Sequence, residues 1–220
     1  MFPAFAPCGD SAILVALGER IDPAFNRRVH ALARRLEDSP RLGFLAAVPG
    51  YATLIVHYDP LLLDYAAALE WAQQQTRLAL DAADETLPAA RRVEVPVIYG
   101  GERGPDLDFV AQHAGLTPAE VVRRHTARDY PVYLIGFAPG FPYLGGMDES
   151  IAAPRLPAPR LSVPAGSVGI AGAQTGIYSV DSPGGWRLIG WTPLRLFEVV
   201  DGQPVSLLAP GDLVRFVAQP

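Results

Sequence analysis

Residues 133–148 read YLIGFAPGFPYLGGMD, and this stretch decides how the second half of the chain is interpreted. An apolar run, Tyr133–Leu134–Ile135, leads directly into a segment with four glycines, two prolines and three aromatic residues. Surface loops are usually rich in polar turn formers, and core strands avoid so much glycine and proline. The stretch therefore indicates a β-rich fold with sharp, rigid turns that carry aromatic side chains.

The same texture continues toward the C-terminus. Eleven glycines lie between Gly136 and Gly190, among short apolar runs such as GSVGIAG, TGIYSV, WRLIGW and LRLFEVV. Short strands with frequent Gly/Pro turns are typical of an all-β barrel or sandwich. Upstream, VEVPVIYG (93–100) indicates a strand, and Thr117–Pro118 marks the start of a helix that ends near His125.

The first part of the chain shows helical periodicity between short strands. Asp22–Pro23 supplies an N-cap and a first-turn proline for a helix through about Glu37. Strands are expected near 11–17, 43–48 and 52–58, and a second helix over 61–80. The order β-α-β-β-α predicts a ferredoxin-like α/β sandwich.

DAADETLPAARR (81–92) reads as a linker, because it is acidic and then contains proline and alanine. We place the domain boundary near residue 87. The expected domains are an N-terminal α+β domain over 1–87 and a C-terminal β-barrel domain over 88–220, which makes the fold class α+β.

Composition excludes several functions. The formal net charge is −5, so neither nucleic acid nor a membrane is an expected partner. All 18 basic residues are arginine, which rules out a Schiff-base lysine or a P-loop lysine. The single cysteine, Cys8, is expected to be buried, and no spacing predicts a metal site. A signal sequence or membrane span is not evident, so we expect a cytoplasmic protein.

Three glycine-rich segments, 136–146, 159–178 and 182–197, are the candidates for a site. Their residues form either tight barrel corners plugged by rings or a pocket lined by polar groups. The polar residues that interrupt the apolar turns favour the pocket when taken together, although each alone suits a turn. They are Arg160, Ser162, Ser167, Gln174, Thr175, Tyr178 and Arg187.

Arginine and histidine carry the expected chemistry. Arg160 and Arg187 could clamp a carboxylate or phosphate in a chain without lysine. His125 closes a helix, where the dipole favours an imidazolium and would hold the pKa near neutral pH; the alternative is a histidine that only compensates the dipole. Asp106 is expected to cap a helix, and Glu102 to lie in a loop, with a metal or general-base role as the lesser alternative.

Long motifs resemble one family. GFAPGFPYLGGMD, RLPAPRLSVPAGSVGIAGAQTGIYSVDSPGGWRLIGWTPLRLF, CGDSAILVALGERIDP and YATLIVHYDP together resemble the family of 5-oxoprolinase B subunits, also called KipI-like or allophanate hydrolase subunit 1. The resemblance covers the whole chain. It implies that the C-terminal domain is a cyclophilin-like β-barrel and that the chain works in a hetero-oligomer with a C (KipA-like) subunit and an A subunit. That complex hydrolyses 5-oxo-L-proline to L-glutamate with ATP, and Mg²⁺ is a candidate companion ion. We expect the ATP site to be shared with a partner subunit, this chain supplying part of it because it has no lysine, and we expect the chain alone to be inactive.

The resemblance also implies where the site lies, with its loops facing the partner and a shared substrate. The catalytic candidates are His125, Arg160 and Gln174, which we expect to line a cavity that the C subunit completes. The candidates for substrate or partner binding are Pro139, Gly140, Phe141, Tyr143, Gly166, Ser167, Thr175 and Arg187.

The alternative function is a binding module without catalysis. A KipI-type inhibitor of a sensor histidine kinase would use the same aromatic loops as a protein interface. A third interpretation, partnership in urea or allophanate metabolism, is weaker.

Overall fold

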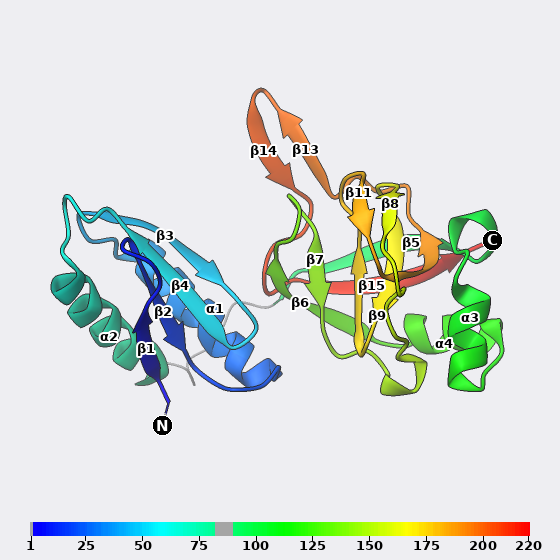
Figure 1. Ribbon diagram of the computed structural model, residues 1–220, viewed down its shortest axis with the longest axis horizontal. Coiled ribbons are helices and arrows are strands. Elements are labelled where there is room, and N and C mark those ends of the chain that lie inside the picture. Colours follow the sequence, from blue (N-terminus) through cyan, green and yellow to red (C-terminus); the bar gives the residue numbers. More distant parts are fainter. Residues whose placement is uncertain (1, 82–89) are drawn as a thin grey trace. The chain divides into compact units, whose positions relative to one another are not determined.

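The computed structural model describes residues 2–81 and 90–220 (Figure 1). The chain forms two units, Met1–Ala89 and Ala90–Pro220. The boundary expected near residue 87, and most of the expected linker, lie in 82–89, outside the described residues.

The N-terminal unit is a four-stranded antiparallel sheet with the strand order β1-β2-β4-β3, packed against two helices. The helix α1 begins where Asp22 accepts a hydrogen bond from the backbone N–H of Ala24 at 2.8 Å, as expected for an N-cap. In chain order the elements are β1 (Ala4–Pro7), β2 (Ala12–Ala16), α1 (Pro23–Asp38), β3 (Phe44–Pro49), β4 (Thr53–Tyr58) and α2 (Tyr65–Asp81).

Three details of this unit differ from the sequence expectations. The edge strand β1 was not predicted, and it precedes the first helix, whereas a ferredoxin-like βαββαβ unit has its last strand after the second helix. The second helix begins at Tyr65 rather than near 61, because the Asp64 carboxylate accepts the backbone N–H of Ala67. Cys8, expected to be buried, is exposed in the turn between β1 and β2.

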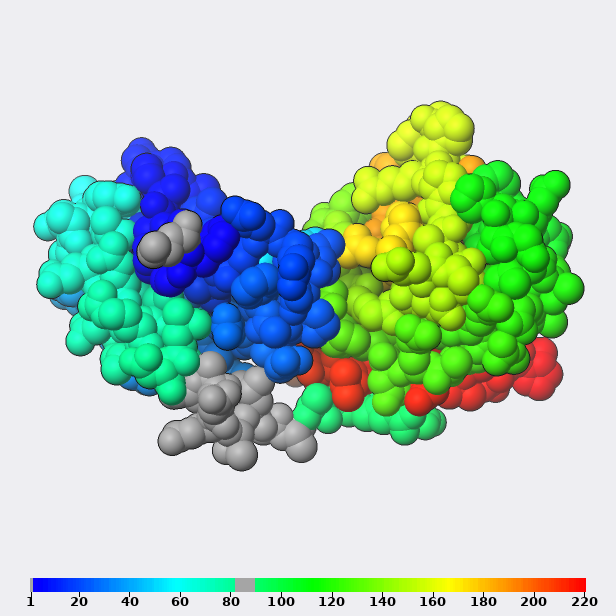
Figure 2. All heavy atoms as spheres, turned by 90° about the horizontal axis from the view of Figure 1, so that it is seen from below, coloured from blue at the N-terminus to red at the C-terminus, as the bar shows by residue number. Residues whose placement is uncertain are grey.

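The C-terminal unit is built on a closed barrel with the strand order β10-β7-β6-β15-β5-β12-β9. The last strand pairs in parallel with the first strand of the unit and antiparallel with β6. Figure 2 shows this red C-terminal strand beside the blue-green start of the same unit. The barrel strands are β5 (Arg92–Tyr99), β6 (Asp129–Ile135), β7 (Pro142–Leu144), β9 (Ser167–Ala171), β10 (Gln174–Ile177), β12 (Arg187–Trp191) and β15 (Leu213–Gln219).

Helices and short strands lie around the barrel (Figure 1). Of the two helices, α4 confirms the expected start, since Thr117 accepts the backbone N–H of Glu120 at 3.2 Å. The remaining elements are η1 (Gly101–Arg103), α3 (Leu107–Ala114), α4 (Pro118–Thr126), η2 (Glu149–Ile151), the pair β8 (Arg160–Val163) and β11 (Ser182–Gly184), and the hairpin β13 (Phe197–Val200) and β14 (Gln203–Ser206). The predicted fold class, an α+β unit followed by a β-barrel, is confirmed.

Within the described residues, every helix is too short or too polar to pass through a lipid bilayer.

Candidate aromatic cavity

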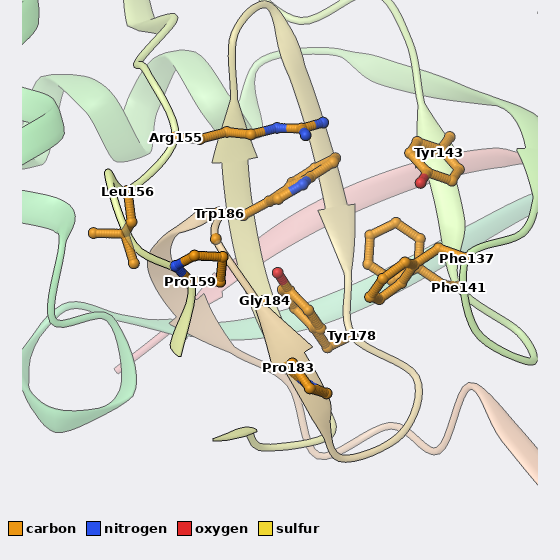
Figure 3. Close-up of a pocket in the computed structure, with 11 residues that line it drawn as sticks. Phe137, Phe141, Tyr143, Arg155, Leu156, Pro159, Tyr178, Pro183, Gly184 and Trp186 are labelled. Carbon is orange, nitrogen blue, oxygen red and sulfur yellow. The ribbon is translucent and has the colours of Figure 1, made fainter. Parts of the chain in front are cut away.

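The cavity lies on the outside of the barrel, beside the β8–β11 pair (Figure 3). Its volume is about 330 Å³, near the lower end of the range for small-molecule sites. Four segments supply its walls: the loop from β6 into β7, the segment between η2 and β8, the residue that follows β10, and the turn from β11 into β12. The lining residues are Phe137, Phe141, Tyr143, Arg155, Leu156, Pro159, Tyr178, Pro183, Gly184, Gly185 and Trp186.

Phe141 is the centre of the aromatic wall. Its ring lies 5.0 Å from the ring of Tyr143, 5.4 Å from that of Tyr178 and 5.5 Å from that of Trp186, and all three pairs have edge-to-face geometry. Edge-to-face pairs of this kind are favoured by the ring quadrupole. Phe141 is 1% exposed, so packing within the unit holds its ring in place.

The loop at 136–146 holds these rings through its backbone. The N–H of Gly136 donates to the carbonyl oxygen of Phe141 at 3.0 Å, which closes the loop at its base. Gly140 has φ +74°, and a Cβ placed there would lie 2.7 Å from the Cβ of Phe197, so only glycine fits. Phe137 also has a positive φ, 67°, and is 62% exposed. An exposed aromatic ring on a left-handed backbone is unusual, and strained backbones of this kind cluster at ligand clamps and switch regions.

The ion pair between Arg160 and Asp106 holds the backbone of Trp186 in place. Asp106 accepts hydrogen bonds from the Arg160 guanidinium at 2.9 and 3.0 Å, and it also accepts the backbone N–H of Leu188 at 2.7 Å. Arg160 in turn donates to the carbonyl oxygen of Trp186 at 3.3 Å. Asp106 stands at the N-cap position of α3, as predicted, but its side chain makes no capping hydrogen bond, because its oxygens accept from Arg160 and from the N–H of Leu188 instead.

The two arginines expected to clamp an anion are both engaged within the chain. Arg160 belongs to the ion pair with Asp106. Arg187 lies over the ring of Phe109, 3.5 Å from its centre, and its Nε donates to the carbonyl oxygen of Pro154 at 3.1 Å. Neither residue lines the cavity. Their observed role is to hold the two segments that carry Trp186 and Arg155.

Arg155 is the cation of the cavity. Among the residues that the structure describes, it has no carboxylate within ion-pair distance and no hydrogen-bond acceptor. Its guanidinium extends across Trp186 toward Tyr143, and the hydroxyl groups of Tyr143 and Tyr178 lie on the sides of their rings nearest Trp186 (Figure 3). Burial raises the pKa of both tyrosines. The charge of Arg155 opposes part of that rise at Tyr143, and a hydrogen bond from the backbone N–H of Trp186 opposes part of it at Tyr178, so both hydroxyls stay protonated at neutral pH.

His125 does not reach this cavity. It is 0% exposed in the barrel interior, against the rings of Tyr130 and Phe216. Burial lowers its pKa to about 3. The expectation of a pKa near neutral is wrong, because the cost of burying a charge outweighs the helix dipole here. The expected grouping of His125 with Arg160 and Gln174 around one cavity is not found.

Both ring nitrogens of His125 are hydrogen-bonded to side chains of this unit, and these bonds determine the tautomer of the imidazole. Thr175 donates its hydroxyl proton to the carbonyl oxygen of Gly169 at 3.0 Å, so its oxygen accepts from Nε2 of His125 at 2.9 Å. The other ring nitrogen, Nδ1, then accepts from the Tyr99 hydroxyl at 2.7 Å, and burial raises the pKa of that tyrosine well above its ordinary value. This network joins β5, α4, β10 and β9 and leaves no donor for a ligand.

Some of the other predicted site residues line the cavity, and the rest are part of the barrel's structure. Phe141 and Tyr143 line the cavity, whereas Gln174 stands at the start of β10, paired with Ala171 across the hairpin. Gly140, Gly166, Ser167 and Thr175 are buried, and the carbonyl oxygen of Pro139 accepts from Ser179 at 2.6 Å. Gly166 has φ +85°, and its N–H and carbonyl oxygen both bond to backbone, which makes it a structural turn.

Sequence reasoning missed Arg155 and Trp186. Arg155 lies between prolines in AAPRLPAPR, five residues before Arg160, and residue type alone does not separate the two. Trp186 follows two glycines in SPGGWRL, which is the available signal for a ring placed against a close backbone turn.

Within the described part of the chain, no three His, Cys, Asp or Glu side chains lie close enough together to hold a metal ion. The arrangement therefore offers aromatic surface, one guanidinium and two phenol hydroxyls, which suits binding of a small anion with an apolar body.

Comparison with known proteins gives the family. The family model described as "Carboxyltransferase domain, subdomain C and D" matches residues 3–208. The chain is 47% identical to the 5-oxoprolinase B subunit of Bacillus subtilis (strain 168), over 95% of this chain and 90% of that one. It is 43% identical to the 5-oxoprolinase B subunit of Escherichia coli O157:H7, over 96% of this chain and 94% of that one.

Among solved structures, TTHA0988 superposes with a TM-score of 0.81 at 39% identity, over 95% of this chain. The match covers 40% of TTHA0988, so that protein continues well beyond the region shared with this chain. The identity, the extent of the match and the shared fold agree: the chain belongs to the carboxyltransferase C/D family that includes the 5-oxoprolinase B subunits.

Proposed function

We propose that the chain is the B subunit of a 5-oxoprolinase complex that hydrolyses 5-oxo-L-proline to L-glutamate, driven by ATP, together with the A and C subunits. The observation that carries the proposal is the 47% identity to a 5-oxoprolinase B subunit across nearly the whole of both chains. The complex would act in the cytoplasm, where ATP is available.

The cavity supports a binding role for this chain within such a complex. Its walls are assembled from rigid segments, and its residues include a cation and two hydroxyl donors. None of them forms an activated nucleophile of the Ser–His or Cys–His kind. The chain would therefore contribute substrate binding and orientation, and would be inactive without its partners.

The cavity residues do not fit a nucleoside triphosphate. Stabilising transferred phosphate takes several cationic groups and a metal ion. This chain has no lysine, and Arg160 and Arg187 are bonded within the fold. We therefore assign ATP and Mg²⁺ to the partner subunits.

The test is reconstitution. The chain is co-expressed with the A and C subunits from its own source, and release of glutamate from 5-oxo-L-proline is measured with and without ATP. The expected result is ATP-dependent release that disappears when this chain is omitted. Equal release from the A and C subunits alone would contradict the proposal. Inhibition of a sensor histidine kinase by the chain, with no glutamate release from the full set, would favour the alternative binding module.

A further inference from the structure

The size and lining of the aromatic cavity restrict its ligand. A volume of about 330 Å³ suits a molecule of a single small ring rather than a nucleotide. The rings of Phe141, Tyr178 and Trp186 are fixed in position, since Phe141 and Tyr178 are 1% exposed and Trp186 is 7% exposed. Phe137, which is 62% exposed and packs edge-on against Phe141 and Tyr178, supplies exposed ring surface to the cavity. Rigid aromatic surfaces bind without the entropic cost of ordering flexible side chains.

The charge of the cavity restricts the ligand further. One guanidinium, that of Arg155, lines the cavity, and no carboxylate does. A single arginine suits a single carboxylate, which it can bind through two parallel hydrogen bonds. A triphosphate would need more positive charge than the lining provides.

The contrast among three nearby arginines indicates that Arg155 is left for a ligand. Arg160 is bonded to Asp106, and Arg187 donates to the carbonyl oxygen of Pro154, directly before Arg155. The two bonded arginines thus hold the cavity's walls, and the third extends from one of these walls across Trp186 (Figure 3).

We propose that this cavity binds a five-membered cyclic amide that carries a carboxylate, with Arg155 pairing with the carboxylate and the aromatic rings covering the ring's methylene groups. The inference rests on the proposed function for its choice of ligand, 5-oxo-L-proline. In this assignment the Tyr178 hydroxyl, which lines the cavity, donates to the amide oxygen. This assigns substrate binding to the present chain, and to residues other than His125, Arg160 and Gln174.

Titration calorimetry on the full chain tests the inference without any partner. The ligands are 5-oxo-L-proline, 2-pyrrolidinone, which lacks the carboxylate, and L-proline, which lacks the amide oxygen. We expect 5-oxo-L-proline to bind at least about tenfold more tightly than either analogue, the gain typical of a charge-assisted hydrogen bond.

Variants separate charge pairing from general damage. In Arg155→Gln, affinity for 5-oxo-L-proline is expected to fall about tenfold or more, while affinity for 2-pyrrolidinone is unchanged. The matched control is Arg103→Gln, because Arg103 lies over the ring of Trp191 and does not line the cavity. It is expected to bind like the unmodified chain.

Two results would overturn the inference: no saturable binding of 5-oxo-L-proline to the full chain, or equal binding by the Arg155→Gln variant. The proposed function fails separately. Glutamate release by the reconstituted complex without binding to this chain would leave the function standing and remove the inference. Binding without glutamate release would support the cavity assignment and remove the function.

Discussion

The barrel interior around His125 and the outer cavity around Arg155 are built from similar parts and behave differently. Each surrounds a nitrogen-containing side chain with aromatic rings and tyrosine hydroxyls. In the interior, both ring nitrogens of His125 have partners within the chain. In the cavity, within the described residues, the Arg155 guanidinium has none. A closed network stabilises the fold, whereas an open one is available to a ligand.

This difference shows why residue type misleads about the site. Histidine, threonine and glutamine are the usual candidates for chemistry, yet the hydrogen bonds of His125 and Thr175 are made to each other, to Tyr99 and to the carbonyl oxygen of Gly169 inside the barrel. Five of the eleven residues that line the cavity are aromatic, and from sequence alone such rings suit a plugged barrel corner as well as a binding surface. The pairing of the strands decides which of these residues lie in the barrel interior and which line the outer cavity.

The largest expected effect comes from breaking the wall of the cavity at Asp106. The variant Asp106→Ala removes the carboxylate that pairs with Arg160 and accepts the N–H of Leu188, and it leaves Arg160 with the carbonyl oxygen of Trp186. Because a partly buried charge loses its partner, the free energy of unfolding should fall by about 3–5 kcal/mol. Urea denaturation measures this, with Asp108→Ala, an exposed residue in the first turn of α3, as control. Equal losses in the two variants would show that the ion pair does not hold the wall.

A change of pH tests the closed network. The native pKa of His125, about 3, lies below its ordinary value of 6.5, so below pH 6.5 the unfolded chain takes up a proton that the native chain excludes. Stability therefore falls as the pH falls, by about 2 kcal/mol between pH 7 and pH 5 from this residue.

Urea denaturation at both pH values checks this, with His125→Gln as the variant that cannot titrate. The variant is expected to be less stable at pH 7 but to lose less on acidification. If the two chains lose the same free energy between pH 7 and pH 5, His125 is not the buried neutral group described here.

Substitution of Phe137, which lines the outer cavity, should change stability the least. Phe137→Gly relieves the left-handed backbone but removes ring contacts with Phe141 and Tyr178, so the free energy of unfolding should change by less than about 1 kcal/mol. Phe137→Ala removes the ring and keeps the strained backbone. Denaturation should find the alanine variant less stable than the glycine variant by about 1 kcal/mol. The opposite order would mean that the backbone at this position is unstrained.

Much of the fold could be predicted from the sequence, because helix caps and turns are determined by residues close together in the chain. Asp22–Pro23 and Thr117–Pro118 start helices locally, so α1 and α4 were expected within a residue of their observed starts. Strand β1 was missed because AFAP is short and exposed at a sheet edge, without an alternating pattern.

The site was less predictable, because its contacts join residues far apart in the chain. Asp106 looks like a helix cap locally, and its carboxylate turns instead to Arg160, a partner 54 residues away. The same holds for Arg155 and Trp186, which become neighbours only when the segment after η2 meets the turn before β12. The aromatic loop at 136–146 could be recognised from the sequence because its glycines and prolines act locally, and three of its residues line the cavity.

In our proposal, Arg155 of this chain pairs with the carboxylate of the substrate. The most direct measurement is the KM for 5-oxo-L-proline of the reconstituted complex that contains Arg155→Gln, compared with complexes that contain the unmodified chain or Arg103→Gln. We expect a KM raised about tenfold or more by Arg155→Gln alone, with kcat changed much less, since a binding contact is lost. An unchanged KM in a complex of normal composition would contradict the claim.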